Sequence, residues 1–169
     1  HDPELAVDVE DEPVVGVDVE LEGVFHRGFR HAGLIAFLAA HPHLKPYRTE
    51  WTIFNEDVRI AGTVDMIYEN ESDGTLMIYD WKRCKDIKKT NNFGAFAITE
   101  CVSHLPDTNF WHYALQLNTY KAILEAKYEK KVSQMCLVCL HPNLPTYEVH
   151  VVPDLSDEMT ALFALRKSQ

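Results

Sequence analysis

The chain has 169 residues, 46% of them apolar, which is enough for one domain with a hydrophobic core. No run of eighteen apolar residues occurs, so we expect no membrane-spanning helix. The first residues lack the basic and apolar parts of a secretion signal, and we expect an intracellular protein that is not secreted. The chain starts at His1 and not at Met, which suggests a fragment of a longer polypeptide.

The net charge of −10 is concentrated at the N-terminus. Residues 1–20 contain eight Asp and Glu residues and no Lys or Arg, which leaves 18 acidic and 16 basic residues, or a charge of −2, for residues 21–169. We interpret residues 1–20 as a flexible acidic leader or linker. A less favoured alternative is a mimic that covers a basic groove. Residues 21–169 are predicted to form a single domain.

The first half of the chain predicts a helix followed by three strands. Apolar residues recur at helical spacing over residues 20–40, and two β-like runs at 47–55 and 58–70 are joined by a short turn. A turn at 71–74 leads into a third strand at 75–83, so these three strands should form an antiparallel meander. The polar segment 84–107 is predicted to contain one short helix at 93–102.

The second half predicts a long helix, two strands and a final helix. The segments are 108–131, 132–142, 146–153 and 154–169. The apolar face of the long helix is expected at Leu115, Ala122, Ile123 and Ala126. Together the elements predict an α/β domain whose mixed central sheet is flanked by helices. Cys136 and Cys139 fall within a predicted strand, which favours buried thiols over a metal site.

Two acidic residues and a lysine interrupt otherwise apolar strands. Asp65 lies in the second strand and Asp80 in the third, each about seven residues from the turn that joins them, so they should lie nearly opposite each other. Lys82 shares a face with Asp80, because residues two apart in a strand point the same way. The alternative is a pair of salt bridges at a sheet edge.

Two neighbouring carboxylates repel each other unless a cation lies between them. Mg²⁺ or Mn²⁺, which prefer oxygen ligands, are the expected ions. Asp65 and Asp80 are the predicted ligands, with the backbone carbonyl of Trp81 as a further donor. Lys82 is then placed to hold a phosphate oxygen or to orient water.

The pattern Gly62-x-x-Asp65, a turn, and Asp80-x-Lys82 resembles the core of PD-(D/E)XK nucleases. Gln116 and Tyr120 form the Gln-x-x-x-Tyr motif of the RecB-like exonuclease branch. The resemblance implies a restriction-endonuclease-like core in which Gln116 and Tyr120 line the active site and Glu50 lies near the metals. The chain also shows weaker similarity to predicted nucleases of large DNA viruses. The expected locations are therefore the cytoplasm, the nucleus or a site of viral replication.

Two features depart from the RecB-like pattern. These nucleases usually carry an upstream metal-binding His, for which His26 and His31 are the candidates within this chain. Alternatively, that His precedes residue 1, or His1 is the remnant of its motif. Some relatives bracket the core with four Cys that bind an iron–sulfur cluster, but no Cys precedes Cys84 here. We therefore expect no cluster.

The loop after the third strand is the expected contact for nucleic acid, since it supplies Arg83, Lys85, Lys88 and Lys89. His112 lies one helical turn before Gln116 and is expected to join these contacts. The sequence thus predicts a Mg²⁺- or Mn²⁺-dependent DNA nuclease in repair, recombination or replication, as part of a larger polypeptide or of a replication or repair complex. The alternatives are a nuclease-fold module for DNA binding or assembly, and an RNA endonuclease.

Overall fold

The computed structural model describes residues 32–168 of the chain. Their helices and strands follow in the order α2 (Ala32–Ala40), β1 (Lys45–Asn55), β2 (Ile60–Glu69), β3 (Leu76–Lys82), the 3₁₀-helix η1 (Glu100–Val102), α3 (Asn109–Lys127), β4 (Val132–Cys139), β5 (Glu148–Val151) and α4 (Ser156–Lys167). None of these helices is both long and apolar enough to cross a membrane. The predicted leader at 1–20 and the candidate metal ligands His26 and His31 lie outside the described residues.

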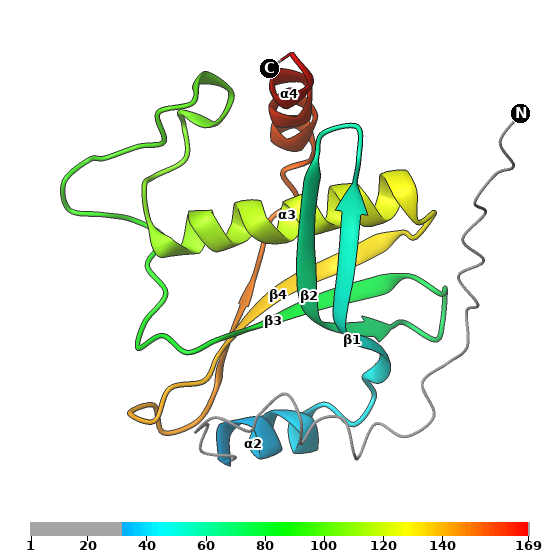
Figure 1. The fold of residues 1–169 in the computed structure, drawn as a ribbon. Helices are drawn as coiled ribbons and strands as arrows, with labels where there is room; N and C mark the ends of the chain where they lie inside the picture. The colour runs from blue at the N-terminus through cyan, green and yellow to red at the C-terminus, as the bar shows by residue number, and fades with distance from the viewer. Residues whose placement is uncertain (1–31, 169) are drawn as a thin grey trace, which may run out of the picture.

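The strands form one sheet in the order β1-β2-β3-β4-β5 (Figure 1). β3 and β4 run parallel, and the other three neighbouring pairs are antiparallel. A parallel pair needs a long crossover connection, and α3 with the loop before it provides this connection. The predicted α/β class, the mixed sheet and the β1-β2-β3 meander are therefore confirmed.

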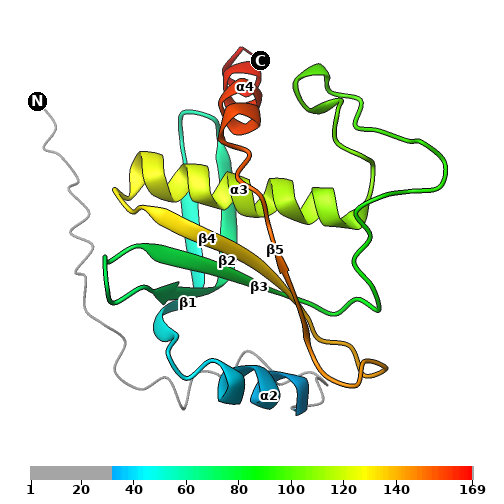
Figure 2. The ribbon, with the colours of Figure 1, turned by 180° about the vertical axis from the view of Figure 1, so that it is seen from behind.

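The two faces of the sheet pack against different helices (Figure 2). Leu76 and Ile78 of β3 belong to a buried cluster that includes the apolar side chains of α3, whereas Tyr79 packs with Leu34 and Phe37 of α2. This division follows from the alternation of side chains along a strand. Asp80 and Lys82 continue the row of Leu76 and Ile78, so they point toward α3.

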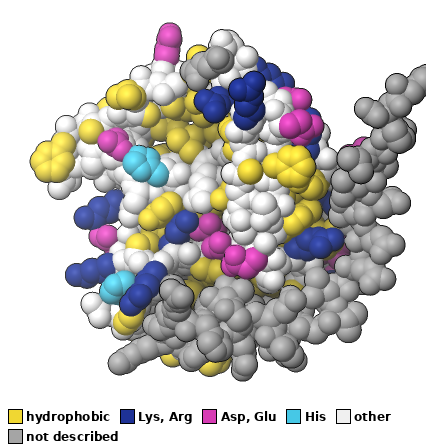
Figure 3. All heavy atoms as spheres, in the orientation of Figure 1, with side chains coloured by type: hydrophobic (Ala, Val, Ile, Leu, Met, Phe, Trp, Pro, Cys, Tyr) yellow, Lys and Arg dark blue, Asp and Glu magenta, His cyan; other side chains and the backbone are white. Residues whose placement is uncertain are grey.

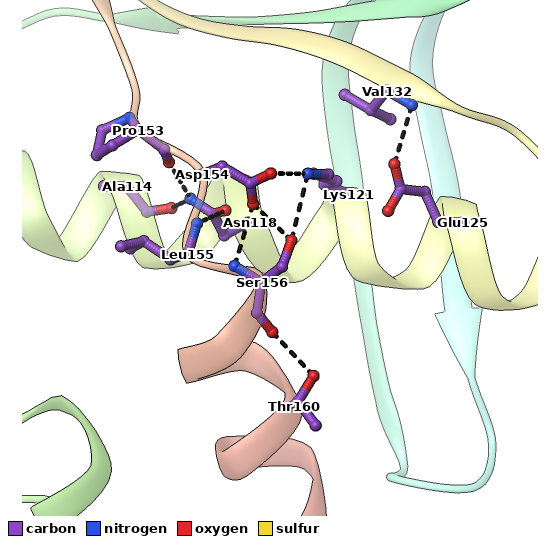
Figure 4. Close-up of polar contacts among 10 residues, drawn as sticks. All are labelled: Ala114, Asn118, Lys121, Glu125, Val132, Pro153, Asp154, Leu155, Ser156 and Thr160. Carbon is purple, nitrogen blue, oxygen red and sulfur yellow. Dashed lines mark hydrogen bonds and ion pairs between the residues drawn. The ribbon is translucent and has the colours of Figure 1, made fainter.

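Polar contacts fix α4 against the middle of α3 (Figure 4). The buried Asn118 donates to the carbonyl of Pro153 at 3.0 Å and accepts from the N–H of Leu155 at 2.8 Å. Lys121 forms an ion pair with Asp154 at 2.5 Å. Because α3 also covers the sheet, these contacts stabilise the helix that carries part of the candidate site.

The prediction of a helix over 93–102 is wrong, since only Glu100–Val102 forms a short 3₁₀-helix. Asn91 explains the difference, because its side chain accepts hydrogen bonds from the N–H groups of Phe93 and Ala95. Gly94 follows with a φ of 62°, which is left-handed backbone outside an α-helix. The chain turns at these residues and then forms an isolated β-bridge between Phe96 and Pro106.

Candidate active site

Asp80 and Lys82 stand side by side near the end of β3. Asp80 is buried, with 3% of its surface exposed, and its Oδ2 lies 2.6 Å from Nζ of Lys82. This oxygen accepts no well-aligned hydrogen bond from the described part of the chain. Its charge therefore depends on the ammonium beside it, since an isolated buried carboxylate is strongly disfavoured.

Asp65 meets β3 at the point where the β2–β3 ladder ends. The last pair of that ladder is Met66 with Tyr79, one residue short of Asp65 and Asp80. Instead of continuing the ladder, Asp65 accepts a hydrogen bond at its Oδ2 from the N–H of Trp81 at 3.0 Å. The two acids therefore lie at neighbouring positions of adjacent strands, as the sequence predicts.

Glu50 lies across from Asp65 on the other neighbouring strand. The pairing of Thr49 with Met66 places Glu50 opposite Asp65. Glu50 has a φ of 48°, which is uncommon for a residue with a side chain and costs about 1–3 kcal/mol. Strained backbone of this kind is concentrated at functional sites, and here it occurs where a third carboxylate approaches the other two.

Helix α3 contributes the opposite wall of the site. Gln116 accepts a hydrogen bond from Nζ of Lys82 at 3.1 Å through Oε1 and donates to the hydroxyl of Tyr120 at 2.8 Å through Nε2. A Cβ at Gly62 would lie 2.6 Å from Cε1 of Tyr120. Gly62 of β2 therefore leaves the space that Tyr120 occupies, and the motif residues form one connected network.

The pKa values of the three acids are all raised, and Asp65 contributes to the rise at the other two. Burial raises the pKa of Asp80 to about 6; the ammonium of Lys82 opposes this rise, and the charge of Asp65 adds to it. Burial also raises the pKa of Asp65, against the Trp81 hydrogen bond and the Lys82 charge. The pKa of Glu50 is raised by burial and by the charge of Asp65. Acids placed together in this way are typical of active sites and cation sites.

The donor atoms suit a hard divalent cation, but the ligand set is not complete. Within residues 32–168, no three His, Cys, Asp or Glu side chains are placed to hold a metal ion. The enclosed Oδ2 of Asp80 and the neighbouring Asp65 supply carboxylate oxygens, which Mg²⁺ and Mn²⁺ prefer. A further oxygen, from the carbonyl of Trp81 or from Glu50, would have to join them.

The predicted nucleic-acid contacts are only partly gathered at this site. Arg83, Lys85, Lys88 and Lys89 follow β3 and are all exposed. Dark-blue side chains gather toward the left edge of Figure 3, on the side where this loop lies in Figure 1. His112 lies one helical turn before Gln116 on α3, and its Nε2 lies 2.7 Å from Oδ1 of Asp107.

Two contacts at the site were not predicted from the sequence. The ring of Tyr113 lies 4.3 Å from Nζ of Lys82, a cation–π contact. Tyr113, Gln116 and Tyr120 share one stripe of α3, so their spacing was the available signal. The Sγ atoms of Cys84 and Cys139 lie 3.1 Å apart, and this contact joins residues too distant in sequence for spacing to reveal it.

Fold and site define a restriction-endonuclease-like α/β protein in which acids from adjacent strands meet a lysine and a Gln–Tyr pair. A family model described as the PD-(D/E)XK nuclease superfamily matches residues 10–167. The match spans most of the chain, and the chain belongs to this superfamily.

Among solved structures, the chain is similar to the crystal structure of SSO0001, with 19% sequence identity and a TM-score of 0.40. The match covers 80% of this chain and 55% of that chain, so this chain spans about half the length of SSO0001. No curated protein matches the chain.

Proposed function

We propose that the chain is a divalent-metal-dependent DNA nuclease of the RecB-like exonuclease type, with a role in repair, recombination or replication. The observation that supports this proposal most strongly is the convergence of Asp65, Asp80 and Lys82 from two adjacent strands. Membership of a nuclease superfamily supports the reaction class. The RecB-like assignment depends on Gln116 and Tyr120, which form a hydrogen-bonded pair beside Lys82.

Asp65 and Asp80 would hold Mg²⁺ or Mn²⁺, together with the carbonyl of Trp81 and with Glu50 as an outer or direct ligand. A bound ion of this kind activates water and offsets the negative charge of the phosphate. The buried position of Asp80 strengthens electrostatic interactions at this point, because water screens them less there. Asp80 would exchange its contact with Lys82 for one with the ion.

Lys82 is the residue that would act on the phosphate directly. Hydrolysis joins a water oxygen to phosphorus, breaks one phosphorus–oxygen bond, and leaves a proton on the departing oxygen. Negative charge builds up on the phosphate oxygens during this step, and a fixed ammonium stabilises it. Gln116 and Tyr113 hold Nζ of Lys82 in place, so little reorganisation is needed.

The test is cleavage of a labelled DNA substrate in Mn²⁺ by the wild-type chain and by Lys82→Ala. We expect the variant to lose about 100-fold or more in rate, as is typical when one donor to a developing oxyanion is removed. Lys131→Ala is the matched control, because Lys131 is exposed and precedes β4 at the far end of the strand from Cys139. Equal rates for wild type and Lys82→Ala would contradict the proposal.

The incomplete ligand set within residues 32–168 favours one alternative, a nuclease-fold module that binds DNA without cutting it. In that case the wild-type chain binds DNA but shows no cleavage that depends on Mn²⁺ and Lys82. Parallel RNA and DNA substrates test the remaining alternative of an RNA endonuclease, in which RNA would be cut faster than DNA of the same sequence.

A further inference from the structure

The loop between β3 and α3 is held firmly against the start of α3. The side chain of Asn109 accepts a hydrogen bond from the N–H of Lys88 at 2.9 Å and donates to the carbonyl of Asp86 at 3.0 Å. Nε1 of Trp111 donates to the carbonyl of Lys89 at 3.0 Å. These bonds fix the backbone that carries two lysines, so any ligand there meets a preformed surface.

The next part of the loop presents an aromatic ring to solvent. Asn91 donates to the carbonyls of Ala95 and Asp107 at 2.7 and 3.2 Å and accepts from the N–H of Phe93 at 3.1 Å. The side chain of Phe93 is 93% exposed in this tightly bonded turn. It therefore contributes almost nothing to the core, and a solvated aromatic ring of this kind is suited to stacking on a nucleic-acid base.

An open hollow of about 470 Å³ lies between this loop and the start of α3, which is within the usual size of ligand sites. Its lining residues are Lys88, Lys89, Thr90, Asn91, Asn92, Phe93, Asp107, Thr108 and Asn109. The aromatic ring, the amide side chains and the ammonium groups therefore border the same space. Ammonium groups can bind a phosphate, while an aromatic ring can stack on the attached base and amide side chains can form hydrogen bonds with it.

The first turn of α3, which follows Thr108, gives the hollow a preference for an anion. Thr108 is the N-cap of the 19-residue α3, yet its side chain does not cap the helix. Thr108 is 8% exposed, and its Oγ1 has no hydrogen-bond partner among residues 32–168. The first turn of a helix has N–H groups without intrahelical acceptors and carries partial positive charge, and both features favour a phosphate.

The neighbouring charges leave the hollow positive. Lys88 lies 3.5 Å from Asp86, an exposed pair that solvent screens. Nζ of Lys89 lies 4.7 Å from the ring centroid of Phe110, close to the start of α3. Asp107 is the acid in the lining, and its Oδ1 lies 2.7 Å from Nε2 of His112, so the lining holds two ammonium groups against one carboxylate.

The hollow lies on the same helix as the candidate active site. Seven residues separate Asn109 from Gln116, which contacts Lys82, and this corresponds to about 10 Å along the helix axis. Successive phosphates of a B-form strand advance about 3.4 Å along the axis, and an unpaired strand can extend further per nucleotide. A strand with one phosphate beside Lys82 can therefore place another beside α3 within about three nucleotides.

We propose that this hollow is a subsite for unpaired nucleic acid, in which Lys88, Lys89 and the start of α3 bind a phosphate and Phe93 stacks on the adjacent base. The identity of the ligand rests on the proposed nuclease function. Bases in a duplex are already stacked on their neighbours and would first have to be unstacked. The subsite therefore selects single-stranded over double-stranded substrate.

The test is fluorescence anisotropy with a dye-labelled oligothymidine and with a duplex of equal length, in EDTA so that no cleavage occurs. We expect the wild-type chain to bind the single strand at least tenfold more tightly. Phe93→Ala should weaken single-strand binding about 5- to 100-fold, the usual loss of one stacked base, and leave duplex binding unchanged. Ile98→Ala is the matched control, because Ile98 is also fully exposed in this segment but does not line the hollow.

Lys89→Gln tests the phosphate contact separately. It should reduce the slope of log affinity against log salt concentration for the single strand by about 1, because about one counterion fewer is released. Lys131→Gln should leave this slope unchanged. Equal effects of Phe93→Ala and Ile98→Ala, or duplex binding as tight as single-strand binding, would overturn the proposal. Cleavage assays test the nuclease proposal separately. Single-strand binding that depends on Phe93, without any cleavage, would support the subsite and contradict the nuclease. Cleavage together with single-strand binding that does not depend on Phe93 would support the nuclease and contradict the subsite.

Discussion

Replacement of Asp80 by Asn is expected to abolish cleavage and, near neutral pH, to make the folded chain more stable. Asp80 is 3% exposed, and its pKa is raised from an ordinary 3.8 to about 6, chiefly by burial. This difference corresponds to about 3 kcal/mol, because each tenfold change in proton affinity is worth about 1.4 kcal/mol. The attraction of Lys82 is already contained in this value.

The gain in stability of Asp80→Asn over the wild type should increase as pH rises. Below about pH 4, Asp80 is protonated in the folded and the unfolded chain alike, so the wild type and Asp80→Asn should be similarly stable. Between about pH 4 and 6 the unfolded chain releases this proton and the folded chain keeps it, so the wild type loses stability as pH rises through 6. The full advantage of the variant, about 3 kcal/mol, is expected at pH 7–8.

Urea denaturation from pH 4 to pH 8 measures this difference. Asp86→Asn is the matched control, because the side chain of Asp86 is 63% exposed and its replacement should change stability by less than about 0.5 kcal/mol at every pH. Added Mn²⁺ should stabilise the wild type, by about 2.7 kcal/mol at a hundredfold excess over its dissociation constant, and should have little effect on Asp80→Asn. A variant that is less stable than the wild type at pH 7, or a pH-independent difference, would refute this reasoning.

Three further variants test the surroundings of the site. Gly62→Ala adds a methyl group 2.6 Å from Cε1 of Tyr120, and we expect a loss of about 1–3 kcal/mol in urea denaturation together with slower cleavage; unchanged values would show that the ring has room to move. Tyr120→Phe removes the hydroxyl that accepts from Gln116 at 2.8 Å; we expect cleavage to fall about tenfold, the value of one hydrogen bond, at a nearly unchanged melting temperature, and full activity would exclude a role for this bond. Asn118→Leu removes the side-chain partner of the Ala114 and Pro153 carbonyls and of the Leu155 N–H; it should cost about 3 kcal/mol without changing DNA affinity in EDTA, whereas weaker DNA binding would contradict a purely structural role.

The strands that carry the acids were predictable because local signals agree there. The turn between β2 and β3 fixes the register, and counting from it places Asp65 opposite Asp80, one residue beyond the observed pair of Met66 with Tyr79. Alternation along β3 places Asp80 and Lys82 toward α3. The alternation along the strands, the position of the turn and the positions of the polar residues all indicate the same register here. When such signals agree, a single sequence is sufficient to predict how two strands pair.

The orientation of α3 was harder to predict. Of the four residues expected on its apolar face, Ile123 is buried, Leu115 and Ala122 are partly buried, and Ala126 is exposed. The buried face includes Asn118 and Lys121, whose partners belong to the segment before α4. These polar residues are buried because a distant segment supplies partners for their hydrogen-bonding groups. Hydrophobic periodicity alone cannot identify such residues.

The loop after β3 differs from its prediction for a related reason. The sequence predicts a short helix at 93–102 within this polar segment, but the side chain of Asn91 accepts hydrogen bonds from the backbone of the residues that follow it. Such side-chain to backbone bonds compete with helix formation. The preformed hollow in this loop depends on Asn109 and Trp111 of α3, and contacts between segments this far apart are not visible in a single sequence.

The central claim is that Asp65 and Asp80 share one divalent cation beside Lys82. The most direct measurement is anomalous diffraction from a crystal of this chain soaked in Mn²⁺. We predict one Mn²⁺ peak between the carboxylates of Asp65 and Asp80, and no such peak in Asp80→Asn. A wild-type crystal without a peak there, or with Mn²⁺ bound only elsewhere, would contradict the claim.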